Sequence, residues 1–451
     1  MRVQFAIWPA PAHTYPLAPL AWALKSAGHE VVIATHPGGV ETIASMGITP
    51  VPVCDIDSMP IPMGPGRAYE KERADLAEIT EALEALGFDA DDPDREHWDV
   101  YSQYYLPAQW DFAPWKGDPN EPLPFLDGLV EFTKAWKPDL VIWDACLPAA
   151  AVAAKVAGAA HARWWTAPDV FCRSIDKFKE LTSKPGAPEL PNPAVETVRA
   201  AAERYGVEID DELLWGQWTI NSQPTEIGPE VSANVVPMRW VSYSSQQPMP
   251  DWLYPVPERP RVAVSLGLSE RAFMEGGWDH IPVLLNALSE LDVEVVATLD
   301  DQQLAKVEQI PENVRVLPFV PLDQLVPTCS LLIHHGGVGT VMPAILNSVP
   351  QLLVDFVGHS IRANPSGAAR LARSRYSLGP ALARFTLAKG AGLVLNVAEP
   401  DASVMREQIR RVLEEKSFKE NAQRLQKEIN SVPGPAEYVK ILEQLTLDHQ
   451  G

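Results

Sequence analysis

The sequence predicts an α/β protein made of two doubly wound domains in tandem. Apolar segments with the character of buried strands alternate with helical segments before residue 170, and the same alternation returns after residue 260. Near-continuous apolar strands separated by helices are typical of a parallel sheet covered on both faces. A group of prolines separates the two runs and predicts a linker: Pro248, Pro250, Pro255, Pro257 and Pro260.

The first run begins with a strand, a loop, a helix and a second strand. The helix carries apolar residues at helical spacing and is followed by Gly28, a residue type common just after helix ends. The strand–helix–strand pattern then returns once. The expected elements are Val3–Trp8 (strand), Pro9–Pro16 (loop), Leu17–Ala27 (helix), Glu30–Thr35 (strand), Asp139–Trp143 (strand), Ala149–Ala157 (helix) and His161–Trp165 (strand).

The second run predicts five strands and three helices. In doubly wound folds the ligand lies in the crevice at the carboxyl ends of the strands, so residues that follow strands are the first candidates for a site. The expected strands are Arg261–Leu266, Val293–Thr298, Val314–Pro318, Leu331–His334 and Gln351–Val354, and the expected helices are Ile281–Leu291, Leu322–Val326 and Ala402–Glu415.

These patterns divide the chain into residues 1–237, 238–432 and 433–451. The first two ranges are the doubly wound domains. Charged residues at 414–427 predict a solvated helix, and the amphipathic segment 436–445 predicts a last helix that packs back on the first domain. The first domain contains an aromatic-rich insertion at about 60–125, which predicts either a large apolar pocket, a partner-binding surface or ordinary core aromatics.

Composition excludes several classes of function. The chain has 451 residues, of which 46% are hydrophobic, and a net charge of −22. That charge disfavours binding to nucleic acid or an anionic membrane. The four cysteines are far apart and form no CxxC pair, which indicates a reducing, cytoplasmic setting and no structural zinc site. No segment has the pattern of a signal peptide or of a membrane-spanning helix.

The most informative motif is the apolar strand that runs into His334-His335-Gly336-Gly337-Val338-Gly339-Thr340. A strand, a glycine turn and a helix present free backbone N–H groups and a helix N-terminus, which suit a phosphate group. The two histidines and Thr340 add side-chain donors, so the motif predicts a diphosphate site. It matches neither the P-loop nor the GxGxxG fingerprint. The alternative is a glycine-rich turn beside a buried histidine.

Together these residues resemble a known family, the GT-B-fold glycosyltransferases of bacterial natural-product pathways. The resemblance spans essentially the whole chain and is greatest to the macrolide and anthracycline deoxysugar transferases. It depends on His13 with the following segment LAPLAWALKSAGHEV, and on WKPDLVIWDA, LLWGQWTINSQP, PERPRVAVSLGLS, FVPLDQLVPTCSLLIHHGGVGT and SVPQLLV. It implies two Rossmann-like domains facing a cleft, with the acceptor bound by the first and the nucleotide sugar by the second.

The resemblance implies that His13, in the loop after the first strand, is the catalytic base that takes the proton of the acceptor hydroxyl. In the wider family an acidic residue orients that histidine, and Asp144 lies at the matching strand end. Asp144 is also suited to cap the next helix, and the sequence leaves both roles open.

For the donor, the resemblance implies a dTDP-sugar. His334 and His335 would reach the pyrophosphate together with Gly337, Val338, Gly339 and Thr340, and Gly267 and Ser269 would contact the phosphates from the other side. Val320 would hold the nucleobase through its backbone. His334 is the weaker candidate of the histidine pair, because a core histidine would stand at the same place. No metal or other cofactor is expected, and Asp300-Asp301 is expected to cap a helix.

The chain departs from the pattern after the strand at 351–354. Many relatives carry an acid–amide or acid–threonine pair there that holds the sugar hydroxyls, whereas this chain has Asp355 and, four residues on, His359. Either residue is a candidate, and fewer hydroxyl-binding groups would suit a highly deoxygenated sugar. Residues 363–389 are expected to form a loop that closes on the donor.

The leading prediction is an inverting, metal-independent glycosyltransferase that moves a deoxysugar, such as an aminosugar, from dTDP to a hydroxyl of a macrolide or polyketide aglycone. The alternatives are a nucleotide-sugar epimerase or hydrolase on the same fold, and a non-catalytic scaffold. The resemblance also implies an auxiliary cytochrome-homologue protein, for which the aromatic insertion is a candidate docking surface. A homodimer is expected only from the general frequency of such assemblies.

Overall fold

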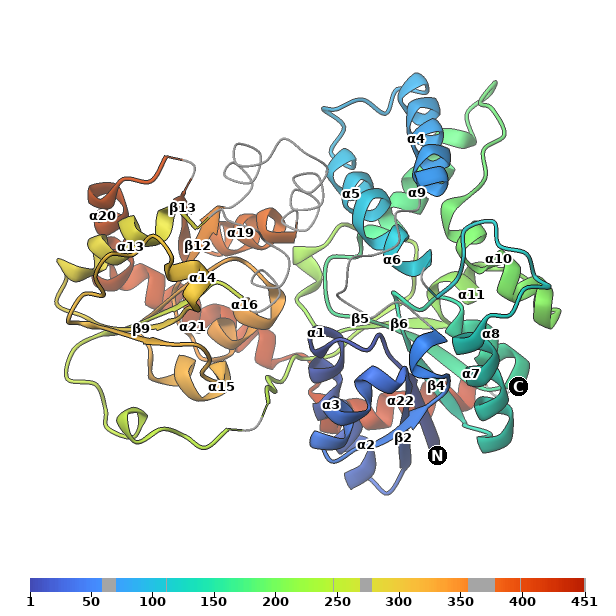
Figure 1. The fold of residues 1–451 in the computed structure, drawn as a ribbon, viewed down its shortest axis with the longest axis horizontal. Coiled ribbons are helices and arrows are strands. Elements are labelled where there is room, and N and C mark those ends of the chain that lie inside the picture. Colours follow the sequence, from blue (N-terminus) through green and yellow to red (C-terminus); the bar gives the residue numbers. More distant parts are fainter. Residues whose placement is uncertain are drawn as a thin grey trace. The chain divides into compact units, whose positions relative to one another are not determined.

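A parallel sheet forms the centre of each half of the chain (Figure 1). The structure is a computed structural model that describes residues 1–58, 70–110, 112–245, 247–267, 278–355, 378–397 and 399–449. Met1–Val241 and Pro433–Gly451 form one compact unit, and Ser242–Val432 form the other. The prediction of two doubly wound α/β domains is confirmed. None of the described helices is long and apolar enough to cross a membrane.

The sheet of the first unit has seven strands in the order β3-β2-β1-β4-β5-β6-β7, all parallel. Strand β1 lies between β2 and β4, with Phe5 opposite both Ile33 and Ile142. The central strands are buried on both faces, which explains their continuous apolar sequences. The strands are β1 (Arg2–Ala6), β2 (Glu30–Thr35), β3 (Thr49–Pro52), β4 (Leu140–Asp144), β5 (Ala160–Trp165), β6 (Trp218–Asn221) and β7 (Val235–Pro237).

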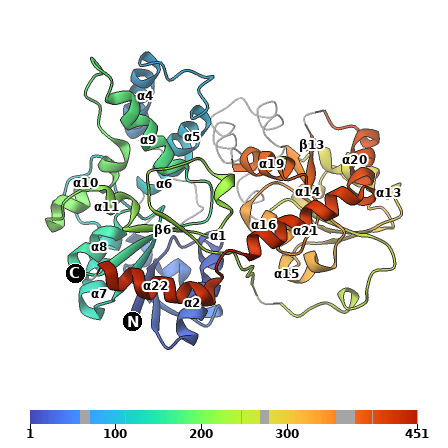
Figure 2. The same cartoon turned by 180° about the vertical axis from the view of Figure 1, so that it is seen from behind.

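Helices cover this sheet, and the last helix of the chain is one of them. Helix α22 packs against α2 (Figure 2). The hydroxyl of Tyr438 in α22 donates a hydrogen bond of 2.9 Å to the carbonyl oxygen of Val236. The helices are α1 (Pro11–Thr14), α2 (Ala18–Ser26), α3 (Val40–Ser45), α4 (Glu70–Ala85), α5 (Arg95–Val100), α6 (Leu106–Trp110), α7 (Pro124–Trp136), α8 (Ala150–Ala157), α9 (Val170–Thr182), α10 (Pro193–Tyr205), α11 (Asp211–Trp215) and α22 (Pro435–His449).

The sheet of the second unit has six parallel strands in the order β10-β9-β8-β11-β12-β13. Its strands are β8 (Arg261–Ser265), β9 (Glu294–Thr298), β10 (Val314–Leu317), β11 (Leu331–His334), β12 (Gln351–Asp355) and β13 (Gly392–Asn396). Its helices are α13 (His280–Ser289), α14 (Asp301–Leu304), α15 (Leu322–Leu325), α16 (Val338–Leu346), α19 (Leu378–Ala388), α20 (Ala402–Glu414) and α21 (Lys416–Asn430).

Each sheet has one point where the strand order reverses. In the first unit it lies between β1 and β4, and in the second unit between β8 and β11. The connections from two such neighbouring strands leave toward opposite sides, so a crevice opens at their carboxyl ends. The segments that follow these four strands are therefore the places where each unit can hold a ligand.

The aromatic insertion is helical and its aromatic side chains are mostly core. Trp98, Tyr101 and Trp110 are each 1% exposed, and they pack with neighbours from α9 and the following loop. Of the interpretations open to the sequence, these three residues support ordinary core packing and not a partner-binding surface. Residues 59–69 lie outside the described part of the insertion.

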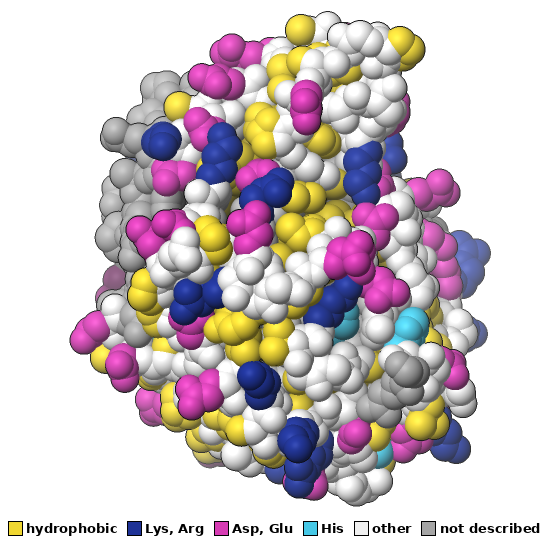
Figure 3. Space-filling view, turned by 90° about the vertical axis from the view of Figure 1, so that its right-hand side faces the viewer, with side chains coloured by type: hydrophobic (Ala, Val, Ile, Leu, Met, Phe, Trp, Pro, Cys, Tyr) yellow, Lys and Arg dark blue, Asp and Glu magenta, His cyan; other side chains and the backbone are white. Residues whose placement is uncertain are grey.

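Charge on the surface is mixed in sign despite the net negative total. On the face in Figure 3, basic side chains lie among acidic ones, with apolar side chains between them. Several pairs bridge separate helices of the first unit, such as Arg204 with Asp127 at 2.8 Å. Ion pairs that remain open to solvent contribute little to stability. This face therefore presents no broad patch of one sign.

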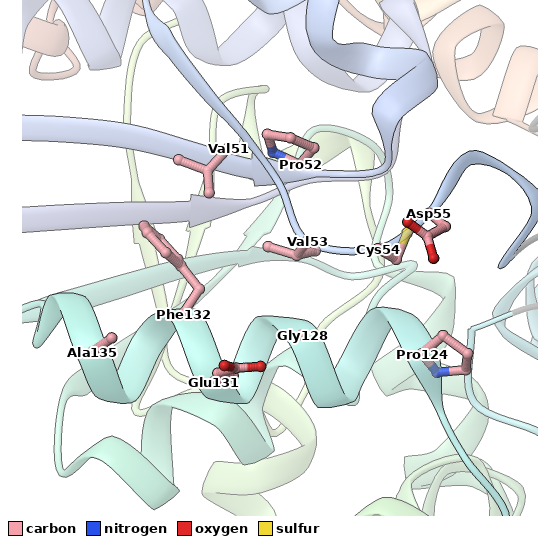
Figure 4. A pocket seen from close by; sticks show the side chains of 10 residues that line it. All are labelled: Val51, Pro52, Val53, Cys54, Asp55, Pro124, Gly128, Glu131, Phe132 and Ala135. Carbon is pink, nitrogen blue, oxygen red and sulfur yellow. The ribbon is translucent and has the colours of Figure 1, made fainter.

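An open groove of about 560 Å³ lies between the end of β3 and helix α7 (Figure 4). Along this groove, Gly128 of α7 lies directly against the main chain of Val53, and a Cβ at position 128 would overlap the Val53 carbonyl oxygen.

Pro50 and Pro52 occupy alternate positions of β3, which forms the edge of the sheet. A proline has no N–H to offer, so this edge is poorly suited to adding a further strand.

We predict that Gly128→Ala destabilises the first unit. In a helix interior, alanine normally gives a free energy of unfolding about 1 kcal/mol higher than glycine does. Here the added methyl group would overlap the Val53 backbone, so the substitution should instead lower the free energy of unfolding by about 2 kcal/mol or more. Urea unfolding measures the change. Glu131→Ala, at an exposed position one turn on, is the matched control and should change stability by less than about 0.5 kcal/mol. A Gly128→Ala protein more stable than the parent would contradict the close approach.

Candidate active site

His13 lies in a one-turn helix at the reversal point of the first sheet. Helix α1 begins at Pro11, whose fixed φ suits the first position of a helix. The prediction of a loop from Pro9 to Pro16 is therefore wrong in detail, because Pro11–Thr14 is helical. The helix holds the His13 side chain against the end of β4, and 27% of that side chain remains exposed.

The end of β4 supplies the partner of His13. The Nδ1–H of His13 donates a hydrogen bond to Oδ2 of Asp144 at 2.8 Å, and the Asp144 side chain is 1% exposed. Because a carboxylate can only accept, this bond places the proton of the neutral imidazole on Nδ1 and the lone pair on Nε2. The other carboxylate oxygen, Oδ1, accepts the backbone N–H of Cys146 at 2.8 Å.

Asp144 pairs with His13 and does not cap the next helix. Helix α8 begins after Ala149 and has no side-chain cap, so Asp144 does not cap it. Its carboxylate instead closes a local turn through Cys146 and pairs with His13. Sequence reasoning passed over Cys146, although its position two residues after a strand-end aspartate is the spacing of such turns.

The environment of the pair changes the pKa of His13. Burial lowers the pKa of this histidine, but the negative charge of Asp144 and the hydrogen bond to it more than compensate, so the pKa lies above the ordinary value of 6.5. The imidazole therefore stays a competent proton acceptor only above that raised pKa.

Aromatic side chains also lie near His13. The ring of Trp8 lies 6.2 Å from that of His13 and 4.3 Å from that of Phe112, which belongs to the insertion. Trp8 is half-buried. Gln109 of α6 donates to the carbonyl oxygen of Ala145 at 2.9 Å and so ties the insertion to the turn after Asp144. The sequence pattern places Trp8 inside the first strand as a core residue, whereas β1 ends at Ala6 and Trp8 lies in the segment that follows it.

The glycine-rich turn of the second unit forms a helix N-terminus without a side-chain cap. Gly336 has φ +87°, a conformation that favours glycine, and Gly337 is the N-cap of α16. Gly337 and Val338 are half-buried and Gly339 is exposed, whereas Thr340 is 5% exposed. The first backbone amides of the nine-residue helix α16 have no side-chain cap and point toward its N-terminus, which is a suitable place for an anion.

His334 is held inside the fold. The N–H of Gly336 donates to its Nδ1 at 3.1 Å, and its Nε2 pairs with Oε1 of Gln351 at 2.9 Å. Burial, with a further contribution from His335, lowers the pKa of His334 to about 3, so it is neutral at pH 7. Both ring nitrogens have protein partners, and the contact of His334 with a diphosphate stays a prediction. The arrangement matches the alternative of a core histidine that shapes the turn.

His335 lies over the start of α16. A Cβ at Gly337 would overlap Nε2 of His335 and lie 3.1 Å from its Cε1, so the imidazole rests on the N-cap glycine. The side chain thus adjoins the same amides that the helix leaves uncapped. The absence of a side chain at position 337 is what permits this placement.

The other residues predicted to bind the nucleotide sugar lie at different places in the second unit, and two of them are outside the described residues. Gly267, with φ +82°, follows β8, and the pairing of Ser265 with His334 brings it to the edge where Gly336 lies. Val320 is 4% exposed, and its backbone forms no hydrogen bond within the turns and loops of the described residues. Asp355 ends β12. Ser269 and His359 lie outside the described residues.

Two further expectations can be compared with the structure. Asp300 is the N-cap of α14, where its side chain accepts the N–H of Gln303 at 2.9 Å in a capping box, as expected for the Asp300-Asp301 pair. Of the segment expected to form a closing loop, Leu378–Ala388 is helix α19. Residues 356–377 lie outside the described part of the chain.

Comparison with known proteins identifies the family. Residues 22–267 match the model described as "Erythromycin biosynthesis protein CIII-like, N-terminal domain", and residues 282–372 and 376–445 match that of the corresponding C-terminal domain. The chain belongs to this family. It is a glycosyltransferase of the macrolide and anthracycline deoxysugar type, and the resemblance seen in the sequence is confirmed.

Individual relatives of the erythromycin biosynthesis protein CIII-like family match over the full length. The chain is 37% identical to the aclacinomycin-T 2-deoxy-L-fucose transferase of Streptomyces galilaeus, over 100% of this chain and 97% of the relative. It is 35% identical to the 10-deoxymethynolide desosaminyltransferase of Streptomyces venezuelae, over 100% and 98%. Among solved structures, glycosyltransferase VinC in complex with dTDP matches with a TM-score of 0.76 and 31% identity, over 99% and 100%.

We predict that Gly337→Ala weakens dTDP binding through His335. The added methyl group must displace the imidazole from the helix N-terminus, and loss of one such donor costs about 1.5–3 kcal/mol, or roughly tenfold or more in Kd. Calorimetric titration with dTDP measures the change. On a His335→Ala background the same substitution should have little effect. Equal effects on both backgrounds would contradict the displacement.

Proposed function

We propose that this glycosyltransferase moves a deoxysugar from a dTDP-sugar to a hydroxyl group of a polyketide-type aglycone, with inversion at the anomeric carbon and without a metal ion. The acceptor oxygen forms a bond to the anomeric carbon as the bond to the diphosphate breaks. The electron pair of that bond leaves with dTDP, and the acceptor proton passes to His13. In this reaction the first unit supplies the base, and the second unit holds the diphosphate.

The hydrogen bond between His13 and Asp144 carries this proposal. It fixes the tautomer in which Nε2 is free to accept a proton, and it stabilises the imidazolium that forms when the proton arrives. The buried carboxylate is held by the Cys146 amide, so the imidazole is oriented before the acceptor binds. An acceptor hydroxyl has a pKa far above neutrality, so removing its proton during the transfer is a step that needs such a base.

The geometry of the second unit supports a metal-independent donor site. The leaving diphosphate gains negative charge in the transition state, and the uncapped amides of α16 provide positive potential at a fixed place. His335 adds a side chain beside these amides, and His334 holds the turn through Gly336. A relative of known structure, VinC, was solved with dTDP, which supports the same nucleotide here.

The acceptor class follows from the relatives and from the side chains beside the base. The relatives named above act on aclacinomycin T and 10-deoxymethynolide. Trp8 and Phe112 form an aromatic pair next to His13, which suits an acceptor with a large apolar body. We propose that this pair contacts the aglycone near the hydroxyl that is glycosylated.

His13→Ala should lower kcat by about 10²–10⁴, because general base catalysis contributes about that factor. The dTDP affinity should change by less than about threefold, since the substitution is outside the unit that holds the nucleotide. Transfer from a dTDP-deoxysugar to a panel of aglycones in the presence of EDTA measures the rate, and NMR of the product gives the anomeric configuration. If the parent is inactive alone, the auxiliary cytochrome-homologue protein is added. Sugar-nucleotide turnover without an aglycone would overturn the proposal.

Asp144→Asn should shift the pH profile as well as the rate. In the parent, kcat/KM rises with pH through the raised pKa of His13 and then levels off. The charge of Asp144 is the main cause of the raised His13 pKa, so removing it should move the acid limb of the profile to lower pH. The plateau value of kcat/KM should fall by about 10²-fold or more. Cys54→Ser, a substitution outside the pair, is the control and should keep the parent profile. An acid limb that moves to higher pH in Asp144→Asn would contradict the assignment.

A further inference from the structure

The base pair has a third side chain beside it. His13, Asp144 and Cys146 each offer one ligand atom, and the nitrogen, oxygen and sulfur atoms all lie within 4.8 Å of one another. They come from helix α1, the last position of β4 and the turn that follows it. Asp144 and Cys146 are 1% and 2% exposed, whereas His13 is partly exposed.

These donor types are specific for a class of ion. Imidazole, carboxylate and thiolate are the ligands of zinc, whereas magnesium and calcium take oxygen ligands. In a tetrahedral zinc site, ligand atoms at about 2.0–2.3 Å from the ion are roughly 3.3–3.8 Å apart. The three atoms can reach that spacing by shifts of about 1 Å, with His13 and Asp144 separating from 2.8 Å.

The surroundings favour three protein ligands and one open position. Oδ1 of Asp144 is already occupied by the Cys146 amide, which orients the carboxylate and leaves Oδ2 for an ion. His13 is the exposed member, so an ion can enter and keep a solvent ligand on that side. Zinc sites that bind water or substrate have this arrangement, with three protein ligands and a fourth coordination position left for the exchangeable ligand.

We propose that His13, Asp144 and Cys146 form a binding site for Zn²⁺, and that zinc inhibits the transfer reaction by occupying the base. The inhibition depends on the proposed role of His13, whereas the binding does not. A neutral imidazole has one lone pair, so a zinc-bound His13 carries its proton on the other nitrogen and cannot accept one from the substrate. The thiol of Cys146 gives its proton to solvent as the zinc–sulfur bond forms.

Cobalt is the probe for the site itself. Co²⁺ titrated into the parent should give one equivalent of binding with a thiolate-to-cobalt absorption band and tetrahedral visible bands. Cys146→Ala should lose the thiolate band and weaken binding at least tenfold. Cys54→Ser removes a half-buried cysteine that is not one of the three proposed ligands, so this variant should keep the thiolate band and the cobalt affinity of the parent. Zn²⁺ should displace the cobalt.

Three outcomes would overturn the proposal: no cobalt binding by the parent, a thiolate band that survives Cys146→Ala, or a band that disappears in Cys54→Ser. If Cys146→Ala does not fold, judged by circular dichroism, His13→Ala removes the partly exposed ligand and should weaken cobalt binding to the same degree. Unchanged binding in that variant would also count against the site.

Inhibition is measured separately, with each variant compared with its own metal-free rate. Zn²⁺ should reduce transfer by the parent and by Cys54→Ser at least tenfold, and should have less than a twofold effect on Cys146→Ala. Cobalt binding without inhibition would refute the link to His13 while the site remains. A parent with no transferase activity would instead count against the proposed function, and the cobalt spectrum would still decide the site.

Discussion

Both candidate sites depend on a constraint of doubly wound sheets. Where the strand order reverses, the connections from two adjacent strands leave toward opposite faces, so neither helix covers the strand ends. In the first unit this happens between β1 and β4, where His13 follows β1 and Asp144 is the last residue of β4. In the second unit it happens between β8 and β11, and Gly267 and the histidine–glycine turn follow those. The topology thus determines where a ligand can be held before any side chain is considered.

The same local device stabilises each strand end. Asp144 and His334 are buried polar side chains, and each accepts the backbone N–H of the residue two positions later. Each then pairs with a side chain from another element, Asp144 with His13 and His334 with Gln351. A buried polar group without partners would be costly, so these paired contacts stabilise the turn geometry. In the proposed function, Asp144 orients the base and His334 shapes the turn beside the diphosphate.

The chemistry that suits the first site to proton transfer also exposes it to metal ions. A histidine held by a buried carboxylate is a good base, and the nearby Cys146 adds the soft ligand that zinc prefers. Regulation or inhibition by zinc would then follow from the composition of the turn after β4 and not from the catalytic pair alone. The second site contains a different donor set, made of backbone amides and imidazole side chains, and suits an anion.

Much of the fold could be predicted because parallel, buried strands have continuous apolar sequences. β2 and β11 agree with the predicted residues, and most other predicted elements differ by one or two positions at their ends. The last helix continues four residues beyond its predicted end, to His449. Four short strands were not predicted: β3, β6 and β7 of the first sheet and β13 of the second. Each has only three to five residues, and proline lies in β3 and β7. The insertion could not be read as helical, because its aromatic residues obscure the helical period.

The sequence by itself determined the fold class, the glycine-rich turn and the residue types available at each strand end, since these depend on local pattern. Only the tertiary structure decided which of these residues meet. His13 and Asp144 are 131 positions apart and come together through the pairing of β1 with β4. His334 likewise meets Gln351, a residue of the neighbouring strand, which holds its Nε2. Such pairings depend on strand order and register. These are long-range properties of the folded chain, so the spacing of residues within one segment does not reveal them.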